Sequence, residues 1–250
     1  MTTTTLRTAA IDWSPPWLAP YRECGRAVER DLADGLHVAD ALNRQLDRSP
    51  IALAAGTLRF IAPDAAAGGE AYEAFIARTA QVPTRDNLHD LFNGLAWLAF
   101  PRLKRRLNER HARQIALDGV GPQRGAVRDR LTLFDENGAL WPAPPRLVDA
   151  LRRRDWHALF VARRADWQRA PLTIVGHALL EKLTAPRKAI TAHVWVVPQG
   201  ADVQAWAADS LRIDAEAPLP LPVLGIPGWW PANENAAFYE DAAVFRPLRG

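Results

Sequence analysis

KAITAHVWVV, residues 188–197, decides the fold class, because it alternates strictly in a chain whose other long segments have helical spacing. Alternation of this kind predicts a strand with Thr191, His193 and Trp195 on one face. A second β signal, RLTLFDENGALW at 130–141, predicts a hairpin that turns at Asn137-Gly138, because both residues tolerate positive φ. We therefore predict a mostly helical α+β fold, a single compact domain with a small β component near 130–141 and 188–197.

Helical spacing dominates the rest of the chain. It covers 24–46 and, after Gly68-Gly69, a short helix at 70–80. PTRDNLHDLFNGLAW, residues 83–97, predicts a helix with Thr84 as its N-cap, and Pro101 either ends it or starts the next helix. We expect residues 1–50 to form a helical extension packed on a single domain that covers 51–250.

The C-terminal segment APLPLPVLGIPGWWPANENAAFYEDAAVFRPLRG is too rich in proline for regular structure and too apolar for disorder. We predict that it wraps the body of the protein. The side chains expected to fill grooves there are Leu224, Ile226, Trp229, Trp230 and Phe238.

Composition predicts a globular protein in a reducing compartment. A chain of 250 residues with 48% hydrophobic and 24% charged residues can bury a large core. Its single cysteine, Cys24, excludes an internal disulfide and has no sequence context typical of a nucleophile. The N-terminus lacks a signal-peptide core and no apolar run is long enough to span a bilayer, so we expect a cytoplasmic protein that does not associate with a membrane.

The basic residues are nearly all arginines. The formal net charge is +3 with a pI near 9.4, and Lys104, Lys182 and Lys188 are the only lysines among 31 basic residues. Codon bias in a GC-rich genome is one explanation for this excess, and selection for an anionic partner is the alternative. The helix predicted at 102–113 gathers several of these charges, which could lie along phosphates or simply face solvent.

A polar strip on the 83–97 helix is the first candidate site. Asp86, His89, Asp90, Asn93 and Trp97 fall within an arc of about 100° at helical spacing, opposite an apolar face. Few polar groups bordered by aromatic side chains are typical of a pocket wall. The alternatives are a solvated surface helix and a buried structural network in which an arginine, residue 85, pairs with one of the aspartates.

Two further pairs carry chemistry. His177 and Glu181, spaced i and i+4 in GHALLEK, share a helix face and could bind one divalent metal, although the same spacing also produces simple ion pairs. Asp135 and Glu136 lie at the predicted hairpin turn, where an ordinary turn also favours acidic residues. His193 is expected to be partly buried with its hydrogen bonds satisfied. Three other histidines are expected on the surface: His37, His111 and His157.

Motifs of the commonest hydrolases, nucleotide-dependent enzymes and zinc fingers are absent from the sequence. The leading hypothesis is a metal-dependent hydrolase acting on a small anionic substrate. Its metal ligands would be His89, Asp90, His177 and Glu181. The remaining site residues would be Asp135, Glu136 and Asn93 in catalysis, one of the two acids being the general base, and Arg85, Trp97, Arg105 and Arg106 in substrate binding.

Two alternatives stay open. The chain could be a non-enzymatic nucleic-acid-binding protein that uses the arginine-rich helix 102–113, or a structural protein whose polar clusters are buried networks.

Long motifs give the chain a family resemblance. They are PTRDNLHDLFNGLAWLAFPRLKRRLN, RDRLTLFDENGAL, GHALLEKL, LPLPVLGIPGWW, NAAFY and VFRP. Together they resemble a bacterial family, domain of unknown function 3025, from roughly residue 51 to the end. The resemblance implies one coherent domain, and it implies no activity and no catalytic role for any residue.

Overall fold

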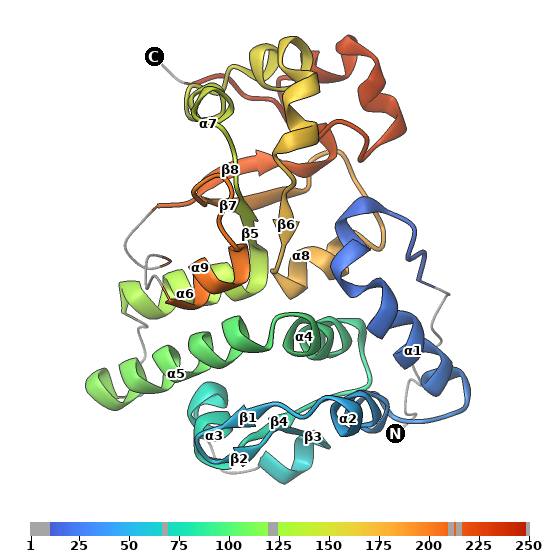
Figure 1. Cartoon of the computed structure of the whole chain (residues 1–250), viewed down its shortest axis with the longest axis vertical. Helices are drawn as coiled ribbons and strands as arrows, with labels where there is room; N and C mark the ends of the chain where they lie inside the picture. The colour runs from blue at the N-terminus through green and yellow to red at the C-terminus, as the bar shows by residue number, and fades with distance from the viewer. Residues whose placement is uncertain (1–10, 67–69, 120–124, 210–212, 214–216, 249–250) are drawn as a thin grey trace. The chain divides into compact units, whose positions relative to one another are not determined.

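The computed structural model describes residues 11–66, 70–119, 125–209, 213 and 217–248 (Figure 1). The chain divides into two compact units. Unit 1 contains residues 1–14 and 18–132, and unit 2 contains residues 15–17 and 133–250. The predicted class, mostly helical α+β, is confirmed. None of the described helices has the length and apolarity that crossing a bilayer requires. The division expected at residue 50 stays a prediction.

Unit 1 combines helices with two small strand pairs. Helices α1, α2 and α4 pack on one another through fully buried side chains that include Val28, Leu42 and Phe92. The helical spacing predicted over 24–46 belongs to two helices, because the chain turns at Gly35, whose φ of 90° suits glycine. The elements are η1 (Pro16–Tyr21), α1 (Arg22–Ala33), α2 (Val38–Arg48), β1 (Ala52–Leu53), β2 (Gly56–Thr57), β3 (Arg59–Ile61), η2 (Pro63–Ala66), α3 (Tyr72–Thr79), β4 (Gln81–Pro83), α4 (Leu88–Ala99) and α5 (Pro101–Asp118).

Helix α4 begins one turn later than the sequence predicted. Its N-cap is Asn87, whose side-chain oxygen accepts a hydrogen bond from the backbone N–H of Asp90 at 2.8 Å. Thr84 instead follows β4, and its hydroxyl donates to the carbonyl of Val82. The prediction of Thr84 as N-cap was therefore wrong. Pro101 occupies the first turn of α5, where its missing N–H would have had no partner in the helix.

Unit 2 is organised around a sheet with strand order β6-β5-β7-β8 (Figure 1). The strand predicted at 188–197 is confirmed as β7, which is parallel to β5 and antiparallel to β8. Helix α6 (Ala126–Asn137) leads into the sheet. The other elements are β5 (Gly138–Trp141), α7 (Pro145–Arg152), η3 (Ala158–Ala162), η4 (Arg164–Arg169), β6 (Thr173–Ile174), α8 (His177–Lys182), β7 (Thr191–Val196), α9 (Val203–Asp209), β8 (Leu219–Pro222), η5 (Val223–Gly225), η6 (Pro231–Glu234) and η7 (Ala236–Glu240).

The hairpin predicted over 130–141 was wrong. The chain is helical as far as Asn137, and Leu131 and Phe134, three residues apart, are both fully buried. Helical burial of this face outweighs the turn signal. Gly138 starts β5 directly after the helix, where a Cβ atom would collide with the backbone carbonyl oxygen of Phe134. The glycine therefore serves a helix-to-strand junction.

The proline-rich segment contains more regular structure than its composition predicted. Pro220 and Pro222 belong to β8, which pairs with β7 at the edge of the sheet. An edge strand tolerates proline, because the missing N–H groups would otherwise face solvent. Leu224 and Ile226 are buried as expected. The aromatic side chains of the segment at positions 229, 230 and 238 are only partly buried.

Candidate functional site

The last turn of α6 and the start of α8 bring three predicted site residues together within unit 2. His177 is buried, with 4% of its surface exposed. Its Nδ1 lies 3.7 Å from Oδ2 of Asp135, and its Nε2 lies 3.6 Å from Oε1 of Glu136. Both carboxylates remain partly open to solvent. One imidazole therefore lies between two acids that are neighbours in the sequence.

Backbone packing fixes this arrangement. The carbonyl of Gly138 accepts hydrogen bonds from the N–H groups of Val175 and Gly176, at 3.0 and 2.9 Å. Gly176 lies so close to the end of α6 that a Cβ atom would stand 2.5 Å from the nitrogen of Gly138 and 2.6 Å from Cα of Asn137. His177 follows immediately, so the same contact that requires glycine also sets the distance from the imidazole to the acids.

The distances around His177 exceed those of hydrogen bonds. Two ligands of one tetrahedral zinc ion, with bonds of about 2.0–2.2 Å, lie roughly 3.3–3.5 Å apart. The 3.6 Å between Nε2 of His177 and Oε1 of Glu136 is close to that value. Asp135, near the other ring nitrogen, has the position of a carboxylate that orients a metal-bound histidine. The alternative to a metal site is a structural one, in which a protonated His177 forms ion pairs with both carboxylates.

Neighbouring side chains add polar groups in the same unit. The ammonium group of Lys182 donates to Oδ1 of Asn137 at 3.0 Å, which ties the end of α8 to the end of α6. His193 pairs in register with Gly138, the first residue of β5. Burial, followed by the charge of Lys182, lowers the pKa of His193 and favours its neutral form. The expectation that His193 has its hydrogen bonds satisfied was wrong, because its buried Nδ1 has no hydrogen-bond partner among the described residues.

In unit 1, the N-terminal half of the polar strip forms a helix-start network. Asp90 is buried and its carboxylate accepts from the backbone N–H of Arg85 at 2.6 Å and from Nε and Nη2 of the same residue, both at 3.0 Å. Asp86 lies outside α4, where it accepts from the N–H of Val38 at 2.8 Å and contacts Nδ1 of His37 at 2.7 Å. These contacts favour structural roles for both aspartates, at the starts of α4 and α2 respectively. His89 is half-buried on the first turn of α4.

The C-terminal half of the strip forms a second network. Buried Asn93 donates to the hydroxyl of Tyr72 at 3.0 Å and accepts from Nζ of Lys104 at 2.9 Å. The ammonium group also lies 5.6 Å from the ring centre of Trp97, which is 2% exposed. Lys104 is therefore turned inward, away from the basic surface to which its position in the sequence assigned it.

Two of the remaining basic residues of α5 are engaged with one acid. Arg106 lies 3.1 Å from Glu109, and Arg105 lies 3.8 Å from the same carboxylate. All three side chains are exposed. His111, expected on the surface, is 4% exposed, so that expectation was wrong. The buried side of α5 thus carries polar residues, His111 and Asn108 among them, beside apolar ones such as Leu107.

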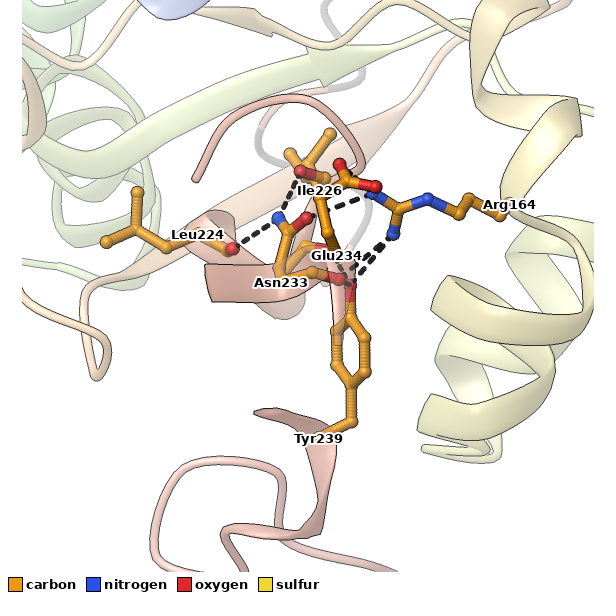
Figure 2. Close-up of polar contacts among 7 residues, drawn as sticks. Arg164, Leu224, Ile226, Asn233, Glu234 and Tyr239 are labelled. Carbon is orange, nitrogen blue, oxygen red and sulfur yellow. Dashed lines mark hydrogen bonds and ion pairs between the residues drawn. The ribbon is translucent and has the colours of Figure 1, made fainter. Parts of the chain in front are cut away.

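A network centred on Arg164 was not predicted from the sequence (Figure 2). Its guanidinium group donates to the backbone and side-chain oxygens of Asn233, both at 3.2 Å, and pairs with Glu234. Asn233, which is fully buried, donates in turn to the carbonyls of Leu224 and Ile226 at 2.8 and 2.7 Å. This network anchors the proline-rich segment. The sequence offered a single sign of this network, an asparagine within the stretch WWPANEN. Its partner, Arg164, lies about seventy residues earlier in the chain, so no local pattern links the two.

Comparison with known proteins supplies a family and no activity. Searches of curated proteins and of solved structures each found no match. A family model described as a protein of unknown function, DUF3025, matches residues 58–249, which is most of the chain. The matched region includes the entire His177 site and the polar strip on α4. The chain belongs to the DUF3025 family.

Proposed function

We propose that this chain is a metal-dependent hydrolase, with Glu136 and His177 as metal ligands and Asp135 as the residue that orients the imidazole. The observation that carries the proposal is the buried imidazole of His177 between two carboxylates, at separations of 3.6 and 3.7 Å. Imidazole nitrogen and carboxylate oxygen together suit zinc and similar divalent ions. Glu181 on the next turn of α8 stays a predicted further ligand.

A divalent ion held there would polarise a substrate oxygen and lower the pKa of water at an open coordination position. The chain's own contribution is to present donors in fixed positions. The backbone bonds to Gly138 hold the two segments together, and the negative charge of Asp135 beside Nδ1 favours the imidazole tautomer whose unprotonated Nε2 is on the side of Glu136. The cationic side chain of Lys182 lies at the end of the same helix and favours a substrate with negative charge.

The test is metal binding followed by hydrolysis. Purified protein is titrated with zinc and manganese, and each form is assayed on aryl phosphates, esters and amides. We expect Glu136→Gln to lose metal-dependent hydrolysis, and Asp135→Asn to weaken metal affinity by about 10–100-fold. Asp149→Asn, an exposed acid on α7, is the matched control and should behave as wild type. Equal metal affinity in all three variants would sink the proposal.

The sequence also predicts His89 as a ligand. This residue belongs to unit 1, whereas Asp135, Glu136 and His177 belong to unit 2. His89→Ala is therefore a separate experiment. A loss of affinity like that of Glu136→Gln would add it to the ligand set, and wild-type affinity would remove it without affecting the donors of unit 2.

Nucleic-acid binding through α5 is a second proposal, and the exposed arginines at 102, 105, 106 and 113 favour it. It is the weaker one, because Glu109 offsets part of the charge at 105 and 106. Binding through phosphates would weaken steeply with salt. Replacing Arg102 and Arg113 together should then reduce affinity for a DNA duplex and flatten the salt dependence. Unchanged salt dependence in this double variant would exclude α5 as the contact surface.

A further inference from the structure

A cavity at the edge of the sheet in unit 2 combines apolar walls with two cationic side chains. Its volume is about 340 Å³, which is the size of pockets that hold small metabolites. Thr191, Pro220 and Pro222 come from one face of the β7–β8 pair, because Thr191 is in register with Pro222. Trp156 and the turn at 243–246 complete the wall. None of these residues belongs to the His177 site.

The charged groups of this cavity are both arginines. Arg154 and Arg246 line it, and no carboxylate is among the described lining residues. The acids nearby in the sequence are engaged elsewhere. Asp155 accepts from the backbone N–H of residue 158, and Asp241 is paired with a lysine, residue 188, at 3.1 Å. Neither arginine forms an ion pair with a described residue, so the cavity has an excess of positive charge.

The rim of the cavity is held in place. The carbonyl of Arg246 accepts from the indole N–H of Trp156 at 2.9 Å, and Nε of Arg246 donates to the carbonyl of Ala243 at 3.0 Å. Arg154 has a φ of 52°, in the left-handed region that an L-residue occupies at an energetic cost. Glycine would adopt this conformation freely. The conformation belongs to the end of α7, where the N–H of Asp155 donates to the carbonyl of Ala150 at 2.9 Å.

We propose that this cavity binds a small molecule that carries a carboxylate or phosphate group on a compact apolar body. Arg154 and Arg246 would hold the oxyanion, because guanidinium groups match its planar donor geometry. The hydroxyl of Thr191, which donates to the carbonyl of Ala189 at 3.2 Å, adds a polar group to the wall, and Trp156 with the two prolines would contact the apolar body. This site is independent of the hydrolase proposal.

Calorimetric titration with defined probes tests the proposal. Benzoate and phenyl phosphate represent the two oxyanions, and benzyl alcohol and inorganic phosphate lack the charge and the apolar body respectively. We expect saturable binding of at least one aromatic anion, with affinity at least tenfold above that of benzyl alcohol and of inorganic phosphate. The comparison of benzoate with phenyl phosphate identifies the preferred oxyanion. The absence of saturable binding for both aromatic anions would overturn the proposal.

The variants separate ligand binding from folding. Arg154→Gly should raise the melting temperature, since it relieves the backbone strain, and should lower the affinity for the anion at least tenfold. Arg246→Gln should lower the affinity similarly and provides an independent test if the first variant does not fold. Arg152→Gln, an exposed arginine on α7, is the control and should bind as wild type. Wild-type affinity in both pocket variants would refute the proposed site.

Discussion

Substitution of Gly176 by alanine should destabilise the protein through a single steric contact. The φ of −62° and ψ of 115° at this position are open to any residue, so the backbone conformation itself imposes no cost. The added Cβ would lie 2.5 Å from the nitrogen of Gly138 and 2.6 Å from two backbone atoms of Asn137. Backbone atoms cannot rotate away as a side chain can. The two segments must therefore separate by nearly 1 Å to reach an ordinary contact of about 3.4 Å.

That separation has a calculable cost. Overpacking a tight site costs about 1–3 kcal/mol. The displaced segment also stretches two hydrogen bonds to the carbonyl of Gly138, each worth about 1 kcal/mol. We expect Gly176→Ala to lower the free energy of unfolding by roughly 2–4 kcal/mol, the range that these contributions span when the bonds are only partly lost. His177 should move with the backbone, so affinity for zinc should also fall.

Urea denaturation of wild type and variant measures the first effect, and zinc titration measures the second. Gly125→Ala is the matched control, because its nearest neighbour is the carboxylate oxygen of an exposed side chain, Asp118, at 3.3 Å and not a backbone atom. We expect this control to lose less than about 1 kcal/mol. A Gly176→Ala protein with wild-type stability would show that the end of α6 and the start of α8 are not packed as described.

Four further perturbations test other parts of the structure. Lys104→Met should lower the free energy of unfolding by about 1–3 kcal/mol, because it leaves the buried amide oxygen of Asn93 without its donor. Arg105→Met on the exposed side should change it by less than about 0.5 kcal/mol. Equal effects in urea denaturation would contradict the inward position of the lysine. The neighbouring carboxylate of Asp86 raises the pKa of His37. The pair should therefore stabilise the fold fully below about pH 6.5, and this stabilisation should be lost as the pH rises through the raised pKa. His37→Gln should abolish that pH dependence. Burial lowers the pKa of His193, so the protein should lose stability as the pH falls below about 6.5, where the unfolded chain binds the proton more readily. The denaturation midpoint of His193→Asn should lack this decrease. Burial also raises the pKa of Cys24 to about 11, so Ellman's reagent should label it slowly in the native protein and rapidly in urea; fast native labelling would disprove its burial.

Local patterns in the sequence predicted those parts of the fold that local physics determines. Strict alternation identified β7, since a strand with two distinct faces requires it. The Asn137-Gly138 pair was misleading, because the same residues fit a hairpin turn and a helix end. Only the buried pair Leu131 and Phe134 distinguishes the two, and their burial depends on tertiary contacts. Pro220 was misleading in a similar way, because the edge position that tolerates it is a property of the sheet.

The candidate site was predictable in its parts. Asp135, Glu136 and His177 were selected from residue type and spacing, and the structure brings these three together within unit 2. Their distances depend on the pairing of β5 with its neighbours, which no local pattern encodes. The inward orientation of Lys104 was hidden for a related reason. A helical arc separates two faces, but it does not indicate which polar side chains a neighbouring helix will cover.

The most direct test of the account is the metal content of protein purified without a nickel column, measured by plasma mass spectrometry. Wild-type protein should carry close to one equivalent of a transition metal, or take it up on dialysis against zinc. His177→Ala should carry little of it under the same conditions, while Asp149→Asn should match wild type. A wild-type chain that stays free of metal after dialysis, or a His177→Ala variant that retains it fully, would contradict the assignment of His177 and Glu136 as a metal-binding pair.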